Sequence, residues 1–303
     1  TLRSDWITTG PKTKQFERDF AEYVGAEDAL ALNSCTAGLH IALMAHGIGP
    51  GAEGITTPMT FAATVNVIEH VGATPVLVDV EPDTLNIDTN RIESAITPQT
   101  RAILPVHYAG QPAGMPAIRE IAVRHDLAVI EDGAHALPAA ICETMVGAGV
   151  NYASFSFYAT KNITTAEGGM LTGSAEAIER ARPYALHGIS RDAWNRYGKG
   201  GSWAYDIVLP GFKYNMTDIQ AALGKCQLRR LKDFHQRRIE IVAMYNEAFS
   251  QFHELQTPCV REGVTHAWHL YRLRLSDTAA VTRDELIATL SEAQIGSSVH
   301  FIP

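Results

Sequence analysis

An alternation of helical patterns with short apolar runs, from Thr13 to about Thr172, constrains the fold of this chain more than any other feature. Phe16, Phe20, Tyr23 and Val24 lie at positions i, i+4, i+7 and i+8, which is one face of a helix. This spacing predicts a helix that stops at Gly25. Three further helices are predicted: one at 36–47, one that begins after Asp88 and one that ends near His125. Strands are predicted at 28–33, 74–80, 101–107 and 127–132. Strands separated by helices of this length form βαβ units. The chain therefore predicts an α/β fold with a mostly parallel sheet covered by helices on both faces.

The second part of the chain has a different pattern. Two further strands are predicted at 152–158 and 168–173 without a helix between them, and a long helix runs from Thr217 to about Phe252. A strand at 268–275 and a capping box of Thr282 and Glu285 follow. We interpret 1–213 as a large domain and 214–303 as a smaller, incomplete α+β domain. Residues 188–213 are rich in Gly, Trp and Tyr and lack periodicity, as is typical of a lid or an inter-subunit arm.

Charge and cysteine usage exclude several classes of protein. A formal net charge of −8 argues against a nucleic-acid scaffold, which needs a basic face. No apolar run approaches the roughly 18 residues of a membrane span, and no signal peptide opens the sequence. The four cysteines are scattered without a CxxC pair, which favours reduced thiols in a cytoplasmic protein. His266 and His269 lack a matching ligand pair, so we interpret them as structural histidines and predict no metal site.

Two ionisable residues follow predicted strands and carry the chemistry. Asp132 ends the apolar strand LAVIED, where the carboxylates of a parallel sheet face the ligand crevice. Lys161 comes shortly after the strand YASFSFY, inside a Thr/Asn run before Glu167. A lone lysine here would most often be solvated. Together, however, the two supply what pyridoxal phosphate (PLP) requires, an amine for covalent attachment and an acid against the pyridine nitrogen.

The phosphate of such a cofactor needs hydroxyls and helix-start amides. Ser34, Cys35 and Thr36 lie where the strand DALALN turns into a helix, and the start of a helix attracts anions. Ser156 lies five positions before Lys161 and offers a second hydroxyl. A simple helix cap also explains the Ser34–Thr36 segment, so the ordered set of residues, rather than any one of them, favours a phosphate site.

Sequence blocks along the whole chain resemble the DegT/StrS family of PLP-dependent sugar aminotransferases, which have PLP fold type I. The blocks occur in family order and include NSCTAGLHIAL, TFAATVNVIEHVGATPVLVDV, EDGAHAL, SFSFYATKN, AEGGM, TDIQAALG and AWHLY. The segments KNIT, KYN, HAWHL and HGIS look most similar to enzymes that make UDP-4-amino-4-deoxy-L-arabinose. Family members normally begin earlier and end later, so the resemblance implies missing segments at both ends.

The resemblance also implies a role for each site residue. Lys161 would bear the cofactor and Asp132 would contact the pyridine nitrogen. Phe61 would stack on the ring, although an aromatic residue that opens a helix is more often part of the core, and His135 would touch the ring or its phenolic oxygen. The phosphate would be held by Thr36, the Cys35 amide and Ser156.

The family commonly completes the phosphate site with an Asn-Tyr-Arg segment of the neighbouring subunit, which implies a homodimer. This chain reads Lys213-Tyr214-Asn215 instead, so either Lys213 or Asn215 would reach the phosphate. A helix N-cap is an equally good interpretation of Asn215.

The implied reaction is transamination of a nucleotide-linked keto-sugar, with glutamate as amino donor and 2-oxoglutarate as its product. Some family members are sugar dehydratases, but these carry a histidine at the lysine position. An inactive regulatory homologue is a further alternative, although Asp132, Lys161 and Ser156 are all present. A Rossmann oxidoreductase is disfavoured because no GxGxxG follows the first strand.

Overall fold

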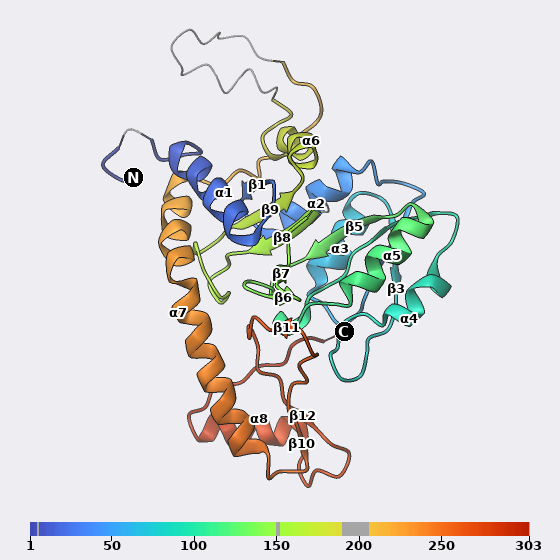
Figure 1. Ribbon diagram of the computed structural model, residues 1–303, viewed down its shortest axis with the longest axis vertical. Helices are drawn as coiled ribbons and strands as arrows, with labels where there is room; N and C mark the ends of the chain where they lie inside the picture. Colours follow the sequence, from blue (N-terminus) through green and yellow to red (C-terminus); the bar gives the residue numbers. More distant parts are fainter. Residues whose placement is uncertain (5, 150–151, 190–205, 303) are drawn as a thin grey trace.

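A computed structural model describes residues 1–4, 6–149, 152–189 and 206–302. In this part of the chain seven strands form one sheet in the order β1-β9-β8-β5-β4-β2-β3 (Figure 1). The strands are β1 Asp28–Leu32, β2 Glu53–Thr56, β3 Thr74–Leu77, β4 Thr100–Ile103, β5 Ala128–Asp132, β8 Tyr152–Ser156 and β9 Gly169–Gly173. β9 pairs antiparallel with β1 and β8, and the other pairs are parallel. The sheet is therefore mainly parallel, which confirms the predicted fold class.

Helices cover both faces of this sheet. They are α1 Pro11–Val24, α2 Cys35–Ala45, α3 Ala62–His70, α4 Thr89–Ile92, α5 Met115–His125, α6 Ala175–Ala185 and α7 Asp218–Phe249, with 3-10 turns at Glu93–Ala95 and Tyr108–Gly110. Alternate side chains of β1 show the layering. Leu30 and Leu32 pack into the core with α2, α3 and α6, while Ala29 and Ala31 pack with α1 and α7. A period of two along a strand places neighbours on opposite faces, so the side chains of β1 contribute to two cores.

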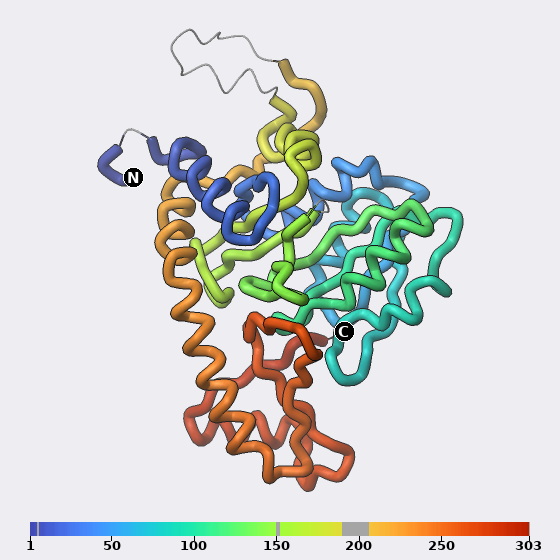
Figure 2. Tube along the Cα trace, viewed as in Figure 1, coloured from blue at the N-terminus to red at the C-terminus, as the bar shows by residue number. Residues whose placement is uncertain are grey.

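The C-terminal part of the described chain lies beyond one edge of the sheet, at the far end of α7 (Figure 2). It holds the strand pair β10 Leu255–Gln256 and β12 Arg274–Leu275, followed by α8 Arg283–Glu292. A second small sheet joins β11 Val264–Thr265 to the hairpin of β6 Ala140–Ile141 and β7 Thr144–Met145. Through β11 this C-terminal part is hydrogen-bonded back onto the main body.

The predicted strand at 268–275 is wrong over most of its length, because only Arg274–Leu275 are in a strand. The backbone before it bonds elsewhere: Ala267 N donates to Gly110 O at 2.8 Å and Leu270 N donates to Ala109 O at 3.1 Å. Two side chains of α7 hold the same segment. His235 donates to the carbonyl of residue 266, and Arg238 donates to the carbonyl of residue 268, each at 2.8 Å. Tertiary contacts thus replace the strand ladder that the apolar alternation predicted.

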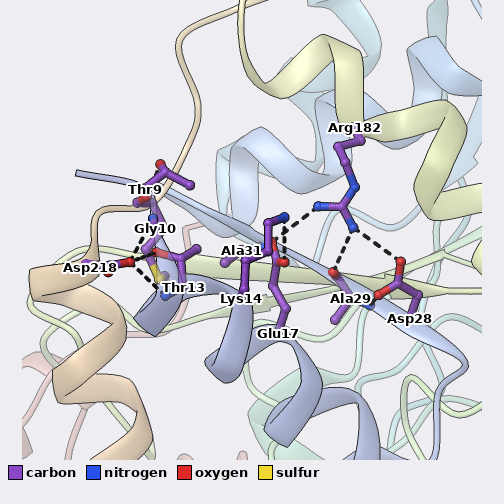
Figure 3. Close-up of polar contacts among 11 residues, drawn as sticks. Thr9, Gly10, Thr13, Lys14, Glu17, Asp28, Ala29, Ala31, Arg182 and Asp218 are labelled. Atoms are coloured by element: carbon purple, nitrogen blue, oxygen red, sulfur yellow. Dashed lines mark hydrogen bonds and ion pairs between the residues drawn. The ribbon is translucent and has the colours of Figure 1, made fainter. Parts of the chain in front are cut away.

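The start of α1 is capped by a residue far away in the sequence (Figure 3). Its N-cap residue is Gly10, which has no side chain to accept a hydrogen bond. Asp218, at the start of α7, accepts instead from the backbone amides of Gly10, Lys12 and Thr13 at 2.8–3.0 Å, and from the Thr13 hydroxyl at 2.7 Å. The carboxylate satisfies amide groups that a helix leaves unpaired at its start. The first and last elements of the main body are therefore joined at one buried carboxylate.

Across the described residues, the structure contains no helix that is both long enough and apolar enough to cross a membrane.

Candidate active site

A cavity of about 510 Å³ opens at the carboxyl edge of the sheet, between the ends of β5 and β8 and the start of α2. Every residue that we predicted to contribute from within one subunit lines it: Cys35, Thr36, Phe61, Asp132, His135, Ser156 and Lys161. Parallel strands place their carboxyl ends on one edge, which is why residues over a hundred positions apart meet here.

Asp132 is the last residue of β5 and is only 6% exposed. Its Oδ1 accepts from the Ala134 amide at 3.0 Å, and its Oδ2 accepts from the Thr64 hydroxyl at 2.6 Å. A buried carboxylate is costly unless such donors surround it. The carboxylate is thus held in one orientation at the cavity wall.

Lys161 lies five residues after the end of β8, in a turn where its amide donates to the carbonyl of Tyr158 at 3.0 Å. Burial lowers the pKa of its ammonium, while the Asp132 carboxylate and the Cys35 thiol act in the opposite direction. The next residue holds the turn in place, since the Asn162 amide nitrogen donates to the carbonyls of Leu137 and Ala267, each at 2.7 Å. The structure therefore presents a partly desolvated amine on a fixed backbone.

The rings of two histidines are in contact at the cavity wall. The rings of His135 and His269 lie 4.3 Å apart with a tilt of 35°. Burial, helped by the neighbouring cations, lowers the pKa of His135 well below its usual range and that of His269 to about 3. His269 Nδ1 bonds to Asn162 Oδ1 at 3.1 Å, whereas His135 Nδ1 is buried and has no partner among the described residues. Both rings are neutral near pH 7, and one of them has a free buried nitrogen.

The start of α2 lines one end of the cavity. Ser34 is the N-cap and accepts from the Ala37 amide at 3.1 Å, while Cys35 and Thr36 occupy the first turn, whose amides have no partner within the helix. Gly169 of β9 lies against the backbone at the start of α2, and a Cβ at this position would be only 2.3 Å from the carbonyl carbon of Ser34. The lack of a side chain at Gly169 therefore allows β9 and the start of α2 to lie this close. The Ser156 hydroxyl accepts from the Tyr158 amide at 3.3 Å and also faces the cavity.

Phe61 is 66% exposed and lies at the N-cap position of α3, so it is not a core residue, and its ring is 6.0 Å from that of Phe301. Our sequence analysis missed several other lining residues: Thr60, Tyr158, His300, Phe301 and His269, the last interpreted only as structural. His269 and Asn162 are 107 positions apart, and no local pattern in the sequence signals their contact.

Lys213 and Asn215 do not line the cavity of their own chain. Lys213 is exposed, and the Asn215 side-chain amide donates to the Thr9 hydroxyl at 2.6 Å. The alternative interpretation of Asn215 as a helix cap is wrong, because Thr217 caps α7 in a capping box with Gln220. Most of the stretch 188–213, including Trp194, Tyr197, Trp203 and Tyr205, lies outside the described residues.

These side chains fit pyridoxal phosphate. The cavity offers an amine for attachment, a buried acid, a helix start for the phosphate and an orphaned imidazole nitrogen beside them. Fold and site together define a PLP-dependent enzyme of fold type I.

The comparison with known families narrows this class. The model of the DegT/DnrJ/EryC1/StrS aminotransferase family matches residues 1–303, and the chain belongs to this family. The spore coat polysaccharide biosynthesis protein SpsC of Bacillus subtilis (strain 168) is 52% identical over 306 residues, covering 100% of this chain and 79% of SpsC.

Solved structures agree with the family. A putative sugar aminotransferase, Spr1654 from Streptococcus pneumoniae, in its PMP form has a TM-score of 0.93 and 38% identity, covering 100% of this chain and 81% of its own. The same protein is also solved in a PLP form. DesV of S. venezuelae has a TM-score of 0.90 and 34% identity, covering 100% of this chain and 78% of DesV. The chain is thus a PLP-dependent sugar aminotransferase.

Proposed function

We propose that this enzyme transfers the amino group of glutamate to the keto group of a nucleotide-linked sugar, releasing 2-oxoglutarate. The observation that carries the proposal is that Lys161 and Asp132 line one cavity at the carboxyl edge of the sheet. The resemblance to nucleotide-sugar aminotransferases supports the substrate class, as does the polysaccharide-biosynthesis name of SpsC. We also propose that the protein is cytoplasmic and that its four cysteines are reduced, as the sequence predicts.

The proposed roles follow from the chemistry of each side chain. Bound PLP supplies an electron sink for the bond that is broken at the substrate carbon. Asp132 would face the ring nitrogen, and His135, which lines the cavity, would contact the phenolic oxygen. Thr36, Ser156 and the Cys35 amide hold the phosphate, and Phe61 covers the ring.

Lys161 has a second role once its amine is released. A neutral Nζ would move a proton between the substrate carbon that bears the amino group and C4′ of the cofactor. Because burial lowers the pKa of the ammonium, a larger share of the amine is neutral at a given pH than for an exposed lysine. The same burial keeps water away from the reacting atoms.

We further propose a homodimer in which Lys213 or Asn215 reaches the partner's phosphate, with 1–213 as the large domain and 214–303 as the smaller one. Exposed apolar side chains near this segment support an interface: Ile7, Ile207, Val208, Ile219 and Leu223. A sugar dehydratase is the less favoured function, because those relatives carry histidine where this chain has Lys161.

Covalent attachment at Lys161 is the first prediction. Borohydride reduction of the PLP-loaded protein, followed by peptide mass mapping, should place a pyridoxyl group on Lys161, and Lys161→Ala should abolish transamination. Lys225→Ala is the matched control, since Lys225 pairs with Asp19 at 3.7 Å on the surface of α7. An adduct on another lysine contradicts the assignment.

The substrate class needs its own measurement. Incubation with glutamate and a panel of UDP- and dTDP-linked keto-sugars, including the UDP-4-keto-pentose, should yield more than one equivalent of 2-oxoglutarate per active site only with an accepted sugar, because the sugar must take the amino group before a second turnover. Equal turnover with free keto-sugars would contradict the nucleotide requirement.

A further inference from the structure

The carboxylate of Asp132 is oriented by a side chain that does not itself line the cavity. Thr64 of α3 is fully buried, and its hydroxyl donates to Asp132 Oδ2 at 2.6 Å. The other oxygen, Oδ1, is fixed by the Ala134 amide at 3.0 Å and lies 3.9 Å from the Cys35 thiol. Each oxygen thus has its own donor.

A second threonine stands behind the first. The hydroxyls of Thr60 and Thr64 are 2.7 Å apart, and geometry alone does not say which of them donates. A hydroxyl has one proton, and an ionised carboxylate only accepts. Thr64 spends its proton on Asp132, so Thr60 must be the donor to Thr64. The three groups form a directed chain from Thr60 through Thr64 to the carboxylate.

Burial makes this chain effective. Thr60 and Asp132 are each 6% exposed and Thr64 is 0% exposed, so little water competes for the bonds. Hydrogen bonds in such surroundings are stronger than in water, and each polarises the next. Bonds to a charged acceptor are also the stronger kind.

The position of the two threonines in the fold matters as well. They flank the start of α3, four residues apart, and Phe61 lies at the N-cap between them without a side-chain cap bond. One short segment therefore carries both the aromatic side chain that faces the cavity and the donor that holds Asp132.

We propose that Thr64, supported by Thr60, is a positioning residue that aims the Asp132 carboxylate at the ring nitrogen of the cofactor. This rests on the proposed role of Asp132. Without the Thr64 hydroxyl, Oδ2 has lost its donor and the carboxylate is free to turn about Oδ1, which the Ala134 amide still holds. A carboxylate that turns away from the ring nitrogen no longer stabilises the proton there.

The test compares Thr64→Val, which keeps the shape of the side chain, with Thr64→Ser, which keeps the hydroxyl. Each is loaded with PLP labelled with ¹⁵N in the ring, and the ¹⁵N chemical shift and the PLP dissociation constant are measured. In Thr64→Val the shift should move toward that of an unprotonated ring, and the dissociation constant should rise about tenfold, as for the loss of one bond to a charged group. Thr64→Ser should restore both, and Thr60→Val should have a smaller effect.

Thr172→Val is the matched control. Thr172 lies in β9, is also fully buried, and donates to the carbonyl of Gly147 at 3.1 Å rather than to Asp132. Asp132→Asn distinguishes the proposed role of Asp132 from the positioning role of Thr64. If Asp132→Asn leaves the ¹⁵N shift unchanged, the proposed role of Asp132 itself fails. If Asp132→Asn moves the ¹⁵N shift but a folded Thr64→Val protein has the wild-type shift, the positioning role of Thr64 is overturned. The same conclusion follows if Thr172→Val moves the shift as much as Thr64→Val does.

Discussion

At the scale of single residues, the segment 266–269 shows how burial sets the charge of a histidine. His266 is 5% exposed, its Nδ1 accepts from the Trp268 amide at 2.8 Å, and its ring stacks on Trp268 at 3.9 Å. Burial, with Arg272 and His235 nearby, lowers the pKa of His266 to about 3. The folded protein therefore requires this ring to be neutral.

This requirement predicts a dependence of stability on pH. Between pH 3 and pH 6.5 the unfolded chain binds a proton at His266 that the folded chain does not, so stability is full above pH 6.5 and falls as the pH falls. The contribution is about 1.4 kcal/mol per pH unit in that window. His266→Asn keeps an acceptor for the Trp268 amide but cannot titrate. The free energy of unfolding, measured with urea at pH 5, 6 and 7, should therefore change less with pH in this variant than in wild type. An equal dependence on pH would contradict the assignment.

At the scale of elements, α1 and α7 depend on each other through Asp218, which is 1% exposed. The same helix pair is packed closely, since a Cβ at Gly224 of α7 would lie 2.5 Å from the ring of Phe16. Further along α1, Glu17 accepts from the Ala31 amide of β1 at 3.0 Å, and Arg182 of α6 lies 3.5 Å from the same oxygen (Figure 3). Buried carboxylates thus tie α1 to three other elements, α7, β1 and α6.

Loss of the Asp218 cap should be costly. Asp218→Ala leaves the amides at the start of α1 unpaired in a buried place and should lower the free energy of unfolding by about 2–4 kcal/mol. Asp218→Asn keeps one accepting oxygen and should cost less. Asp233→Ala, an exposed position on the same helix, should stay within about 0.5 kcal/mol of wild type. Equal urea midpoints for the Asp218 and Asp233 variants would refute the cap.

At the scale of the whole molecule, the proposed homodimer makes a prediction that no single chain can satisfy. Lys161→Ala and the Lys213→Ala/Asn215→Ala double variant should each be inactive alone. In a mixed dimer the second chain supplies Lys161 and the first supplies the segment across the interface, so one site is intact. Random exchange should restore about a quarter of wild-type activity. Hybrids that form but stay inactive, or an active monomer, would rule out shared sites.

How much of this protein can be read from the sequence depends on the range of each signal. The predicted strands and helices around Asp132, the Asp88 and Thr282 caps and the strand end that carries Asp132 are local features, and the structure has them. The strand β2 and the helix α6 were not predicted, and no residue range was predicted for α3. The long helix is one residue shorter at its start and about three residues shorter at its end than predicted, and such differences are common where helix ends fray.

The sequence by itself determined the α/β class and predicted residues that the structure places around one cavity, because periodicity and strand-end polarity act over a few positions. Only the tertiary structure decided three long-range contacts: the Thr64 hydroxyl on Asp132 and the contact between the rings of His135 and His269 at the site, and the Asp218 cap on α1. The partners in these contacts are 68, 134 and 205 positions apart. Which donors and rings meet across such separations depends on how the layers pack, and packing leaves no pattern in the local sequence.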